Sequence, residues 1–380
     1  MIYHVKPREE KTQVSLMQIL MGIEQKRNDI PNTTTVRKVD ETYIDYADER
    51  FDLREFINTL KIFNESTNTL RAAKRWDLYE HFKLPKKSGG WRPIDAPKPQ
   101  LGAALTTLRT LIEGAIGDYF HHPCAFAYVR KRCTTDLVKV HQKMESRWFA
   151  HFDFSNFFGS TTLDFVLRMA EMVYPLNLVM KDEEGRAEYS KAMELCFLNG
   201  GLPQGTQMSP FITNIMMIPL DHELLKFCQN NKPHLIYTRY ADDIIISSKY
   251  DFDYREVEKR INEILSNFGA PFKIKPEKTH YGNRAGRNWI LGVMLNKDNR
   301  ITIGHDKKKY FKAMLTGFVM SCKNNTPWDI EDIYEFQGKI AYYRMVEKDY
   351  IDHILTTYSQ KFGVNIEKLI KDSLKGYKVA

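Results

Sequence analysis

The chain has 380 residues, of which 43% are hydrophobic and 12% aromatic, and this length and apolar content exclude a disordered or low-complexity polypeptide. They suffice for a folded protein of two or three subdomains with a sizeable core. Lysine and arginine number 56 against 48 for aspartate and glutamate, and the net charge of +8 permits a polyanionic partner such as nucleic acid without requiring one.

The predicted elements begin with a polar, helical N-terminal part. Within residues 1–75, apolar side chains recur at helical spacing in two stretches, residues 16–23 and residues 56–63. This part contains no motif that indicates catalysis or ligand binding. A basic, turn-rich segment follows from Leu84 to Pro99, and residues 101–120 then carry the apolar stripe of an amphipathic helix.

The centre of the chain alternates predicted strands and helices. From Trp148 to about Asn296 this alternation favours an α+β fold with helices packed on one face of a sheet. From Lys307 onward the apolar spacing is helical throughout, which predicts a small helical bundle.

Targeting signals and cysteines favour a cytoplasmic protein. The first residues lack the basic region and apolar core of a signal peptide, and no window approaches the about 18 uninterrupted apolar residues of a membrane span. The five cysteines are odd in number and scattered, which is typical of reduced thiols. Cys124 and Cys133 lie near three histidines, but no CxxC or HxxxH spacing supports zinc. We expect no membrane partner.

Three aspartates stand at predicted strand ends. Asp242 and Asp243 lie between two β-branched and aromatic runs, residues 234–239 and 244–248, at the tip of a predicted hairpin. Asp153 closes another apolar strand. Each has an ordinary interpretation, since an Asp-Asp pair is usually a solvated turn and a lone Asp after a strand is usually a helix cap. Together they indicate a Mg²⁺ site, because Mg²⁺ prefers hard oxygen ligands.

A glycine-rich turn over residues 200–205 precedes a predicted helix over residues 211–227. Its glycines allow the backbone to approach a ligand closely, and Gln204 offers a planar amide that can hydrogen-bond a nucleotide or base. Alone this is an ordinary loop before a helix. The order Asp153, Gln204, Asp242 along the chain is more informative than any one of these elements.

In this order the elements resemble those of the reverse transcriptases, specifically the bacterial lineages that include retron, group II intron and phage-defence enzymes. The resemblance covers about Phe82 to Asn296. DFSNFF at residues 153–158 resembles the first palm motif, GLPQG at residues 201–205 the second and YADD at residues 240–243 the third. The resemblance implies an α+β right-hand polymerase fold whose palm is an antiparallel sheet backed by helices. The implied parts are an N-terminal helical extension over residues 1–75, fingers over 76–147, a palm with a fingers insert over 148–300 and a helical thumb over 301–380.

The resemblance also implies a two-metal site. Asp153 and Asp242 would bridge two Mg²⁺ ions, for which Mn²⁺ is an expected substitute. Asp243 would be a further ligand or an electrostatic support, and the carbonyl of Phe154 a backbone ligand. These three aspartates are the expected catalytic residues.

Seven residues are expected to bind the substrate: Arg92, Lys86, Phe158, Gln204, Tyr240, Ala241 and Lys278. Arg92 and a lysine near Lys86 would clamp the triphosphate by charge-assisted bonds. Phe158 matches the steric gate that excludes a 2′-hydroxyl, which predicts deoxynucleotides as substrates. Lys278 would protonate or neutralise departing pyrophosphate. Their ordinary interpretations are, respectively, a solvated basic turn, a plain core phenylalanine and a surface lysine.

The implied activity is RNA-directed DNA polymerisation, in which dNTPs are joined on template RNA to give a DNA product. A compact polymerase without a nuclease constellation resembles the phage-defence enzymes, which act with a dedicated non-coding RNA. A retron-like enzyme that makes a small DNA from structured RNA is the alternative, because residues 137–141 and 290–292 keep only the His and the Gly of the corresponding retron elements.

The three motifs are also compatible with a different mode of synthesis. Template-independent or protein-primed DNA polymerisation could use the same site, whereas a non-enzymatic RNA-binding scaffold is disfavoured because all three aspartates are present. The sequence leaves undecided the template and primer, the presence of a homo-oligomer or partner protein, the consequence of the DNA product and the role of residues 1–75.

Overall fold

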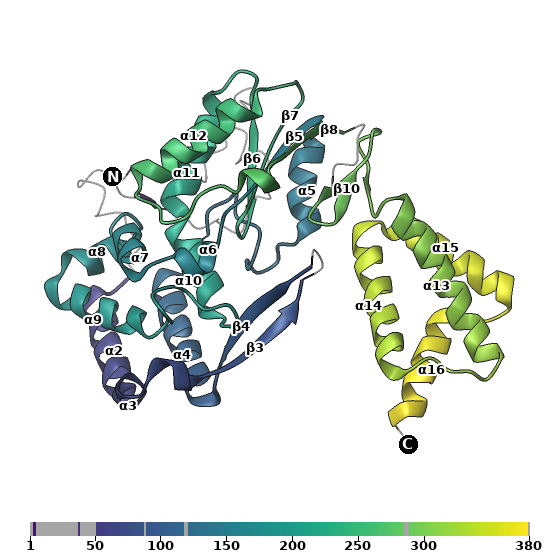
Figure 1. The fold of residues 1–380 in the computed structure, drawn as a ribbon, viewed down its shortest axis with the longest axis horizontal. Helices are drawn as coiled ribbons and strands as arrows, with labels where there is room; N and C mark the ends of the chain where they lie inside the picture. The colour runs from purple at the N-terminus through teal and green to yellow at the C-terminus, as the bar shows by residue number, and fades with distance from the viewer. Residues whose placement is uncertain are drawn as a thin grey trace. The chain divides into compact units, whose positions relative to one another are not determined.

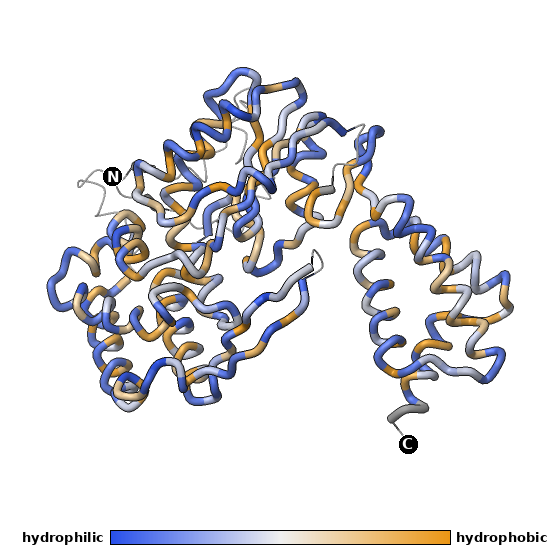
Figure 2. The backbone as a smooth tube through the Cα atoms, in the orientation of Figure 1, coloured by the Kyte–Doolittle hydropathy of each residue, from blue (hydrophilic) through white to orange (hydrophobic). Residues whose placement is uncertain are grey.

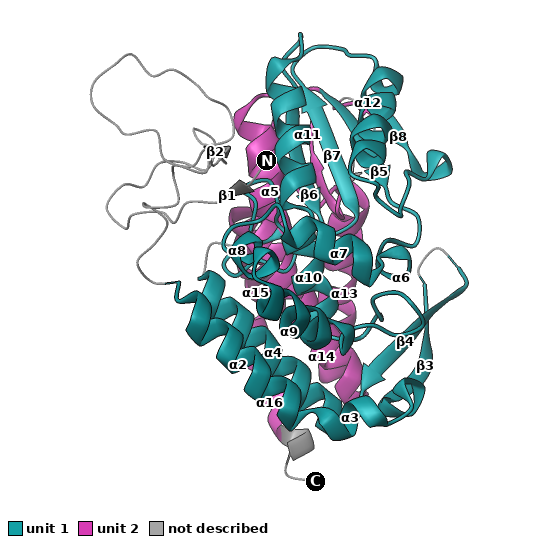
Figure 3. Cartoon of the chain, turned by 90° about the vertical axis from the view of Figure 1, so that its left-hand side faces the viewer, with its two compact units in different colours: residues 1–133, 148–281 teal, residues 134–147, 282–380 magenta. Residues whose placement is uncertain are grey.

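The structure is a computed structural model, and the residues that it describes are 3–4, 37–38, 51–86, 89–117, 121–284 and 289–378. Within it the chain forms two compact units, coloured separately in Figure 3. Unit 1 holds residues 1–133 and 148–281, and unit 2 holds residues 134–147 and 282–380. The subdomain boundaries expected from the sequence stay predictions.

The central sheet of unit 1 has the strand order β6-β7-β5-β8 (Figure 1). β7 (Asp243–Ser248) lies between two antiparallel neighbours, β5 (Trp148–Asp153) and β6 (Ile236–Tyr240). β8 (His280–Asn283) joins the other side of β5. The apolar residues at the centre of β7 are fully buried, which is why this strand is a continuous hydrophobic run rather than an alternating one.

Two helices of unit 1 follow the glycine-rich turn where one was predicted. α10 (Met208–Met216) and α11 (Ile218–Asn230) are separated at Met217, so the single helix expected over residues 211–227 was wrong. Pro219 lies in the first turn of α11, where its missing N–H and fixed φ are tolerated, whereas in the interior of a longer helix it would break the hydrogen-bond ladder. α11 packs against β6 and against α12 (Tyr254–Asn267).

The N-terminal half of unit 1 supplies a hairpin and a set of helices. β3 (Tyr79–Pro85) and β4 (Trp91–Pro97) form a two-stranded antiparallel sheet in which Leu84 pairs with Arg92. The predicted helix over residues 101–120 is α4, which begins at Pro99 and ends at Ile116 before the left-handed Gly117. The other elements of unit 1 are β1 (Tyr3–His4), β2 (Arg37–Lys38), α2 (Leu53–Ser66), α3 (Asn68–Ala72), η2 (Arg75–Leu78), α6 (Phe157–Ser160), α7 (Leu163–Ala170), α8 (Leu176–Lys181), α9 (Glu183–Glu194) and η3 (Pro276–Lys278).

The apolar stretch predicted over residues 56–63 is confirmed as the buried face of α2. The stretch over residues 16–23 lies outside the described residues. Within the described residues no cysteine forms a disulfide, which is compatible with the predicted reduced thiols. No helix in the described part of the chain is both long and apolar enough to cross a membrane.

Unit 2 is a helical bundle with a small sheet, and its helices confirm the prediction from Lys307 onward. Apolar residues recur at intervals along each helix (Figure 2), and the side chains of Phe311, Phe318 and Phe336 are buried together, with ring centroids 5.3 to 6.4 Å apart. Its elements are α5 (Thr134–Lys143), β9 (Trp289–Ile290), β10 (Val293–Leu295), β11 (Ile301–Thr302), α13 (His305–Lys323), α14 (Ile330–Val346), α15 (Lys348–Phe362) and α16 (Ile366–Lys378). The mixture of helices and antiparallel sheets confirms the predicted α+β class.

Candidate active site

The YADD sequence forms the tip of the β6–β7 hairpin, as predicted. Tyr240 pairs with Asp243, which leaves Ala241 and Asp242 as a two-residue loop. Ala241 has φ +57°, the left-handed conformation that such hairpin loops require at their first position. The turn places the Asp242 and Asp243 carboxylates close enough to interact electrostatically, although they are neighbours in sequence.

The register of β5 against β7 brings the third aspartate to the same end of the sheet. Asp153 is the last residue of β5 and pairs with Asp243. Its carbonyl accepts from the backbone N–H of Lys275 at 2.8 Å, and the next residue, Phe154, donates its N–H to the Asp242 carbonyl at 3.4 Å. The strand end is therefore held between the YADD turn and the segment before η3.

The Phe154 side chain is buried and leaves only its backbone beside the carboxylates. Its ring packs against Phe157 and Phe272, with centroid distances of 5.5 and 4.8 Å. The apolar rings thus anchor the segment that directly follows Asp153. This packing is compatible with the expected ligand role of the Phe154 carbonyl, which stays a prediction.

Burial and neighbouring negative charge disfavour the ionisation of Asp242 and Asp243. Burial, followed by the charges of Asp242 and Asp153, raises the pKa of Asp243 to about 7. Burial and the Asp153 charge also raise the pKa of Asp242, against the opposing effects of Lys278 and Arg92. The Lys278 ammonium pairs with Asp153, and this hydrogen bond raises the pKa of Lys278. The cluster therefore favours a nearby positive charge.

The donor set fits a divalent cation that is completed by substrate. In the described ranges, no group of three or more His, Cys, Asp and Glu side chains is placed to hold a metal ion by itself. Mg²⁺ rarely needs such a cage, because it usually keeps several waters and binds one or two carboxylates together with substrate phosphates. Asp153 at the end of β5 and Asp242 in the adjoining turn offer hard oxygen ligands. Burial is the main cause of the raised pKa of Asp243, and a divalent ion would relieve the repulsion from Asp242 and Asp153 that adds to it.

The Gln204 loop joins the turn that carries Phe158. Leu202 donates its N–H to the Phe158 carbonyl at 2.9 Å. Gly201 lies so close to Gly159 that a Cβ at position 201 would be 2.1 Å from the Gly159 carbonyl oxygen. Phe158 itself is half-buried, whereas its neighbour Phe157 is 2% exposed and packs in the core.

The same loop also contacts the β3–β4 hairpin that carries Arg92. Asp95 donates its N–H to the Gln204 carbonyl at 2.7 Å. Arg92 is exposed on β4, and its charge lowers the pKa of Asp242. The Gln204 loop therefore links the segment of Phe158 to β4, and β4 carries Arg92, which interacts electrostatically with Asp242. Lys86 lies at the tip of the hairpin, where its N–H donates to the Gly90 carbonyl at 3.0 Å and no described contact links its ammonium to the aspartates.

A model of the family described as "Reverse transcriptase (RNA-dependent DNA polymerase)" matches residues 84–310. This chain belongs to the reverse transcriptase family. The matched range contains all three aspartates, all seven expected substrate residues and Phe154. The prediction of an RNA-directed DNA polymerase is therefore confirmed, and the family generally uses divalent metals.

Curated relatives of this reverse transcriptase carry retron names. The "Retron Ec83 reverse transcriptase" of Escherichia coli is 28% identical over 312 residues, covering 78% of this chain and 91% of the relative. The "Retron Ec73 reverse transcriptase" of the same species is 25% identical over 302 residues, covering 77% and 88%. These relatives confirm the predicted resemblance to a bacterial, retron-like lineage.

Among solved structures, apo telomerase from Candida tropicalis is 10% identical to this chain, with a TM-score of 0.43. The match covers 78% of this chain and 62% of the telomerase chain. This likeness is weak and adds nothing to the family assignment.

Sequence reasoning missed two residues next to the site of this reverse transcriptase. Tyr128 is 55% exposed, and its pKa is raised first by partial burial and then by the Asp242 charge, so it lies close enough to Asp242 to interact electrostatically. Arg239 is fully buried and donates to the Ala241 carbonyl at 3.1 Å. The available signal was an arginine inside the otherwise uncharged run IYTRY of β6.

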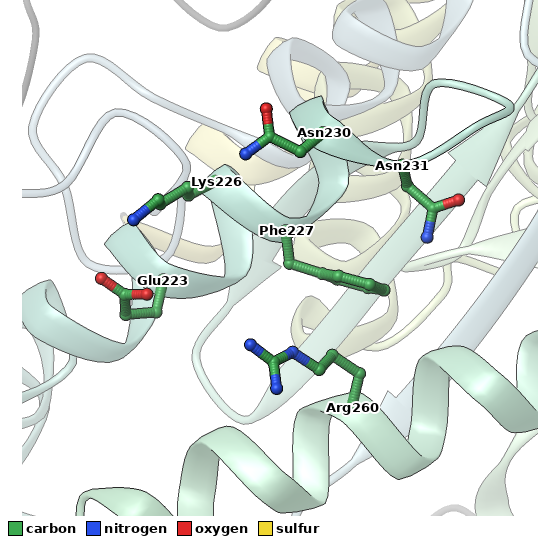
Figure 4. A pocket seen from close by; sticks show the side chains of 6 residues that line it. All are labelled: Glu223, Lys226, Phe227, Asn230, Asn231 and Arg260. Carbon is green, nitrogen blue, oxygen red and sulfur yellow. The ribbon is translucent and has the colours of Figure 1, made fainter.

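A cavity of about 300 Å³ lies elsewhere in unit 1, between α11 and α12 (Figure 4). Arg260 extends from α12 toward Phe227 of α11. The lining residues are Glu223, Lys226, Phe227, Asn230, Asn231 and Arg260. None of them belongs to the three motifs, so the candidate active site remains the aspartate cluster and not this cavity.

Proposed function

We propose that this reverse transcriptase copies a dedicated, structured non-coding RNA into DNA, as a retron-like enzyme, with Asp153, Asp242 and Asp243 as its catalytic residues. The observation that carries the proposal is the pairing of Asp153 with Asp243 at the end of the sheet where the YADD turn presents Asp242. The retron names of the relatives favour the retron-like enzyme, which was the alternative prediction, over the phage-defence type that was the first prediction. A role in phage defence and a cytoplasmic location are proposed from the sequence resemblance.

The carboxylates would hold the cofactor. Two bound Mg²⁺ ions, or Mn²⁺ in their place, would activate the 3′-oxygen of the primer and stabilise the leaving pyrophosphate. Asp153 and Asp242 are the expected ligands, with the Phe154 carbonyl as a backbone ligand. Asp243, whose pKa is about 7, would add negative charge once a divalent ion favours its ionised form.

The surrounding residues would bind and orient the dNTP. Arg92 and Lys86 would contact the triphosphate, and Lys278 would neutralise the developing charge on pyrophosphate after leaving Asp153. Phe158 and Gln204 would frame the sugar and base. Tyr240 and Ala241 would lie beside the primer terminus. The Gln204 loop is linked to Phe158 through the N–H of Leu202 and to β4 through the Gln204 carbonyl, which supports a single preformed nucleotide site.

The test is purification of the protein with its bound nucleic acid, followed by sequencing of that nucleic acid and measurement of dNTP incorporation. We expect a defined RNA and its complementary DNA, with incorporation lost in Asp242→Ala and after RNase treatment. Asp164→Ala is the matched control, because Asp164 is an exposed aspartate in the first turn of α7 and belongs to no motif.

Two results would contradict the proposal. Incorporation that survives Asp242→Ala would refute the assignment of Asp242 to the catalytic site. Incorporation that survives loss of all RNA would refute RNA-templated synthesis and favour template-independent or protein-primed polymerisation. Analytical ultracentrifugation of the same preparation would show any homo-oligomer or partner protein.

A further inference from the structure

A buried ion pair contacts the turn that carries Asp242. Arg239 in β6 and Asp221 in α11 each have 0% of their side chains exposed. Arg239 Nε donates to Asp221 Oδ1 at 2.8 Å, and Nη2 donates to Oδ2 at 2.7 Å. Tyr237 donates its hydroxyl to the same carboxylate at 2.6 Å. Both Asp221 oxygens are therefore satisfied, and the guanidinium is fixed in one orientation.

The remaining terminal nitrogen of the guanidinium is directed to the turn itself. Arg239 Nη1 donates to the Ala241 carbonyl at 3.1 Å and to Asn214 Oδ1 at 3.3 Å. Asn214 donates in turn to the Ala127 carbonyl at 3.0 Å, directly before Tyr128. One side chain thus links the left-handed residue of the YADD turn with the segment that brings Tyr128 to the carboxylates.

Stability of the fold alone does not account for this arrangement. Replacing a buried ion pair by apolar residues of similar volume is often neutral or stabilising, by about 1–4 kcal/mol. A left-handed alanine costs about 1–2 kcal/mol and persists only when its surroundings hold it. The bond from Arg239 to the Ala241 carbonyl holds that residue.

We propose that Arg239 is a positioning residue whose guanidinium fixes the Ala241–Asp242 turn, so that the Asp242 carboxylate can bind a divalent ion together with Asp153. The inference rests on the proposed function, since it takes Asp242 as a metal ligand. Asp221 orients the guanidinium, and Asn214 extends the same constraint to Ala127.

Two variants of the full chain separate positioning from folding. Arg239→Lys keeps the charge, but a single ammonium cannot contact both Asp221 oxygens and the Ala241 carbonyl at once. The combined variant Arg239→Met, Asp221→Leu and Tyr237→Phe removes the two charges and the hydroxyl together, so that no buried charge is left unpaired.

Asn64→Ala is the matched control for loss of a buried polar contact. Asn64 is fully buried in α2 and donates to the Glu188 carbonyl at 2.9 Å. Figures 1 and 3 show α2 and α9 away from the β6–β7 hairpin. This control is expected to lower the unfolding midpoint while leaving metal binding unchanged.

Two quantities are measured. The first is the affinity for Mn²⁺ alone, determined from the electron paramagnetic resonance signal of free Mn²⁺. The second is steady-state dNTP incorporation at saturating Mg²⁺. In both Arg239 variants we expect Mn²⁺ affinity and kcat to fall about 10- to 100-fold, the range typical of residues that orient metal ligands. KM for dNTP should change less than about twofold, because the triphosphate contacts are untouched. The combined variant should keep its unfolding midpoint near that of the wild type.

Wild-type Mn²⁺ affinity and kcat in the combined variant would overturn the positioning role. Asp242→Ala distinguishes this failure from failure of the proposed function. If Asp242→Ala is inactive while the Arg239 variants are fully active, only the positioning role is refuted. If Asp242→Ala is active, the metal site itself is refuted.

Discussion

Replacement of Gly201 by alanine would force apart two loops of the proposed nucleotide site. A Cβ at position 201 would lie 2.1 Å from the Gly159 carbonyl oxygen and 2.7 Å from its carbon, whereas real Cβ atoms essentially never approach within 3.0 Å. Both neighbouring atoms belong to the backbone, so rotation of a side chain cannot relieve the overlap. Either the Gln204 loop or the Phe158 turn must therefore move by about 1 Å, a displacement that can cost about 100-fold in rate.

A hydrogen bond would transmit this displacement to the residues that are proposed to contact the nucleotide. Leu202 donates to the Phe158 carbonyl at 2.9 Å, and Gln204 lies two residues further along the same loop. We expect kcat/KM for dNTP incorporation by Gly201→Ala to fall about 100-fold. Single-nucleotide primer extension measures this ratio, and circular dichroism checks that the variant is folded.

Two glycine controls isolate the close approach. Gly114 lies in α4, and a Cβ added there would meet no atom within 4 Å, so Gly114→Ala should stabilise the helix by about 0.5–1 kcal/mol and leave kcat/KM unchanged. Gly200 has φ +82° and open space around it, so Gly200→Ala tests backbone strain without overlap. A Gly201→Ala enzyme as active as Gly114→Ala would refute the reasoning.

Three further predictions concern the carboxylates and their neighbours. Phe158→Ala should raise the use of ribonucleotides relative to deoxynucleotides, measured as the ratio of the two kcat/KM values; an unchanged ratio would leave Phe158 as a packing residue. Lys278→Met should lower kcat about 100-fold with little change in KM, whereas a raised KM with an unchanged kcat would indicate that Lys278 only binds dNTP. Burial and the neighbouring carboxylates raise the pKa of Asp243 from 3.8 to about 7, so the folded state binds this proton more tightly than the unfolded state, and the contribution of Asp243 to metal-free stability should be lost as pH rises between these values. Burial lowers the pKa of His121, His122 and His151, and these groups change the midpoint in the opposite direction. The unfolding midpoint of the wild type in EDTA should therefore decline relative to that of Asp243→Asn as pH rises, and a constant difference between the two proteins contradicts the assignment.

Local features of the fold could be predicted because they depend on neighbours in sequence. The YADD hairpin follows from two β-branched runs around a two-residue loop, and the helices from Lys307 onward follow from apolar spacing. The single helix expected over residues 211–227 was wrong, because Pro219 fits the apolar pattern but lies in the first turn of a second helix that begins at Ile218.

The amino-acid sequence by itself determined the family, the three aspartates and the order in which the motifs follow one another. Only the tertiary structure decided that Gly201 must lie against Gly159, that Lys278 pairs with Asp153 and that Arg239 holds the Ala241 turn. The physical reason is distance along the chain: strand register and side-chain packing join residues that no local period relates. A buried arginine in β6 is only an interruption of an apolar pattern until Asp221 is found beside it.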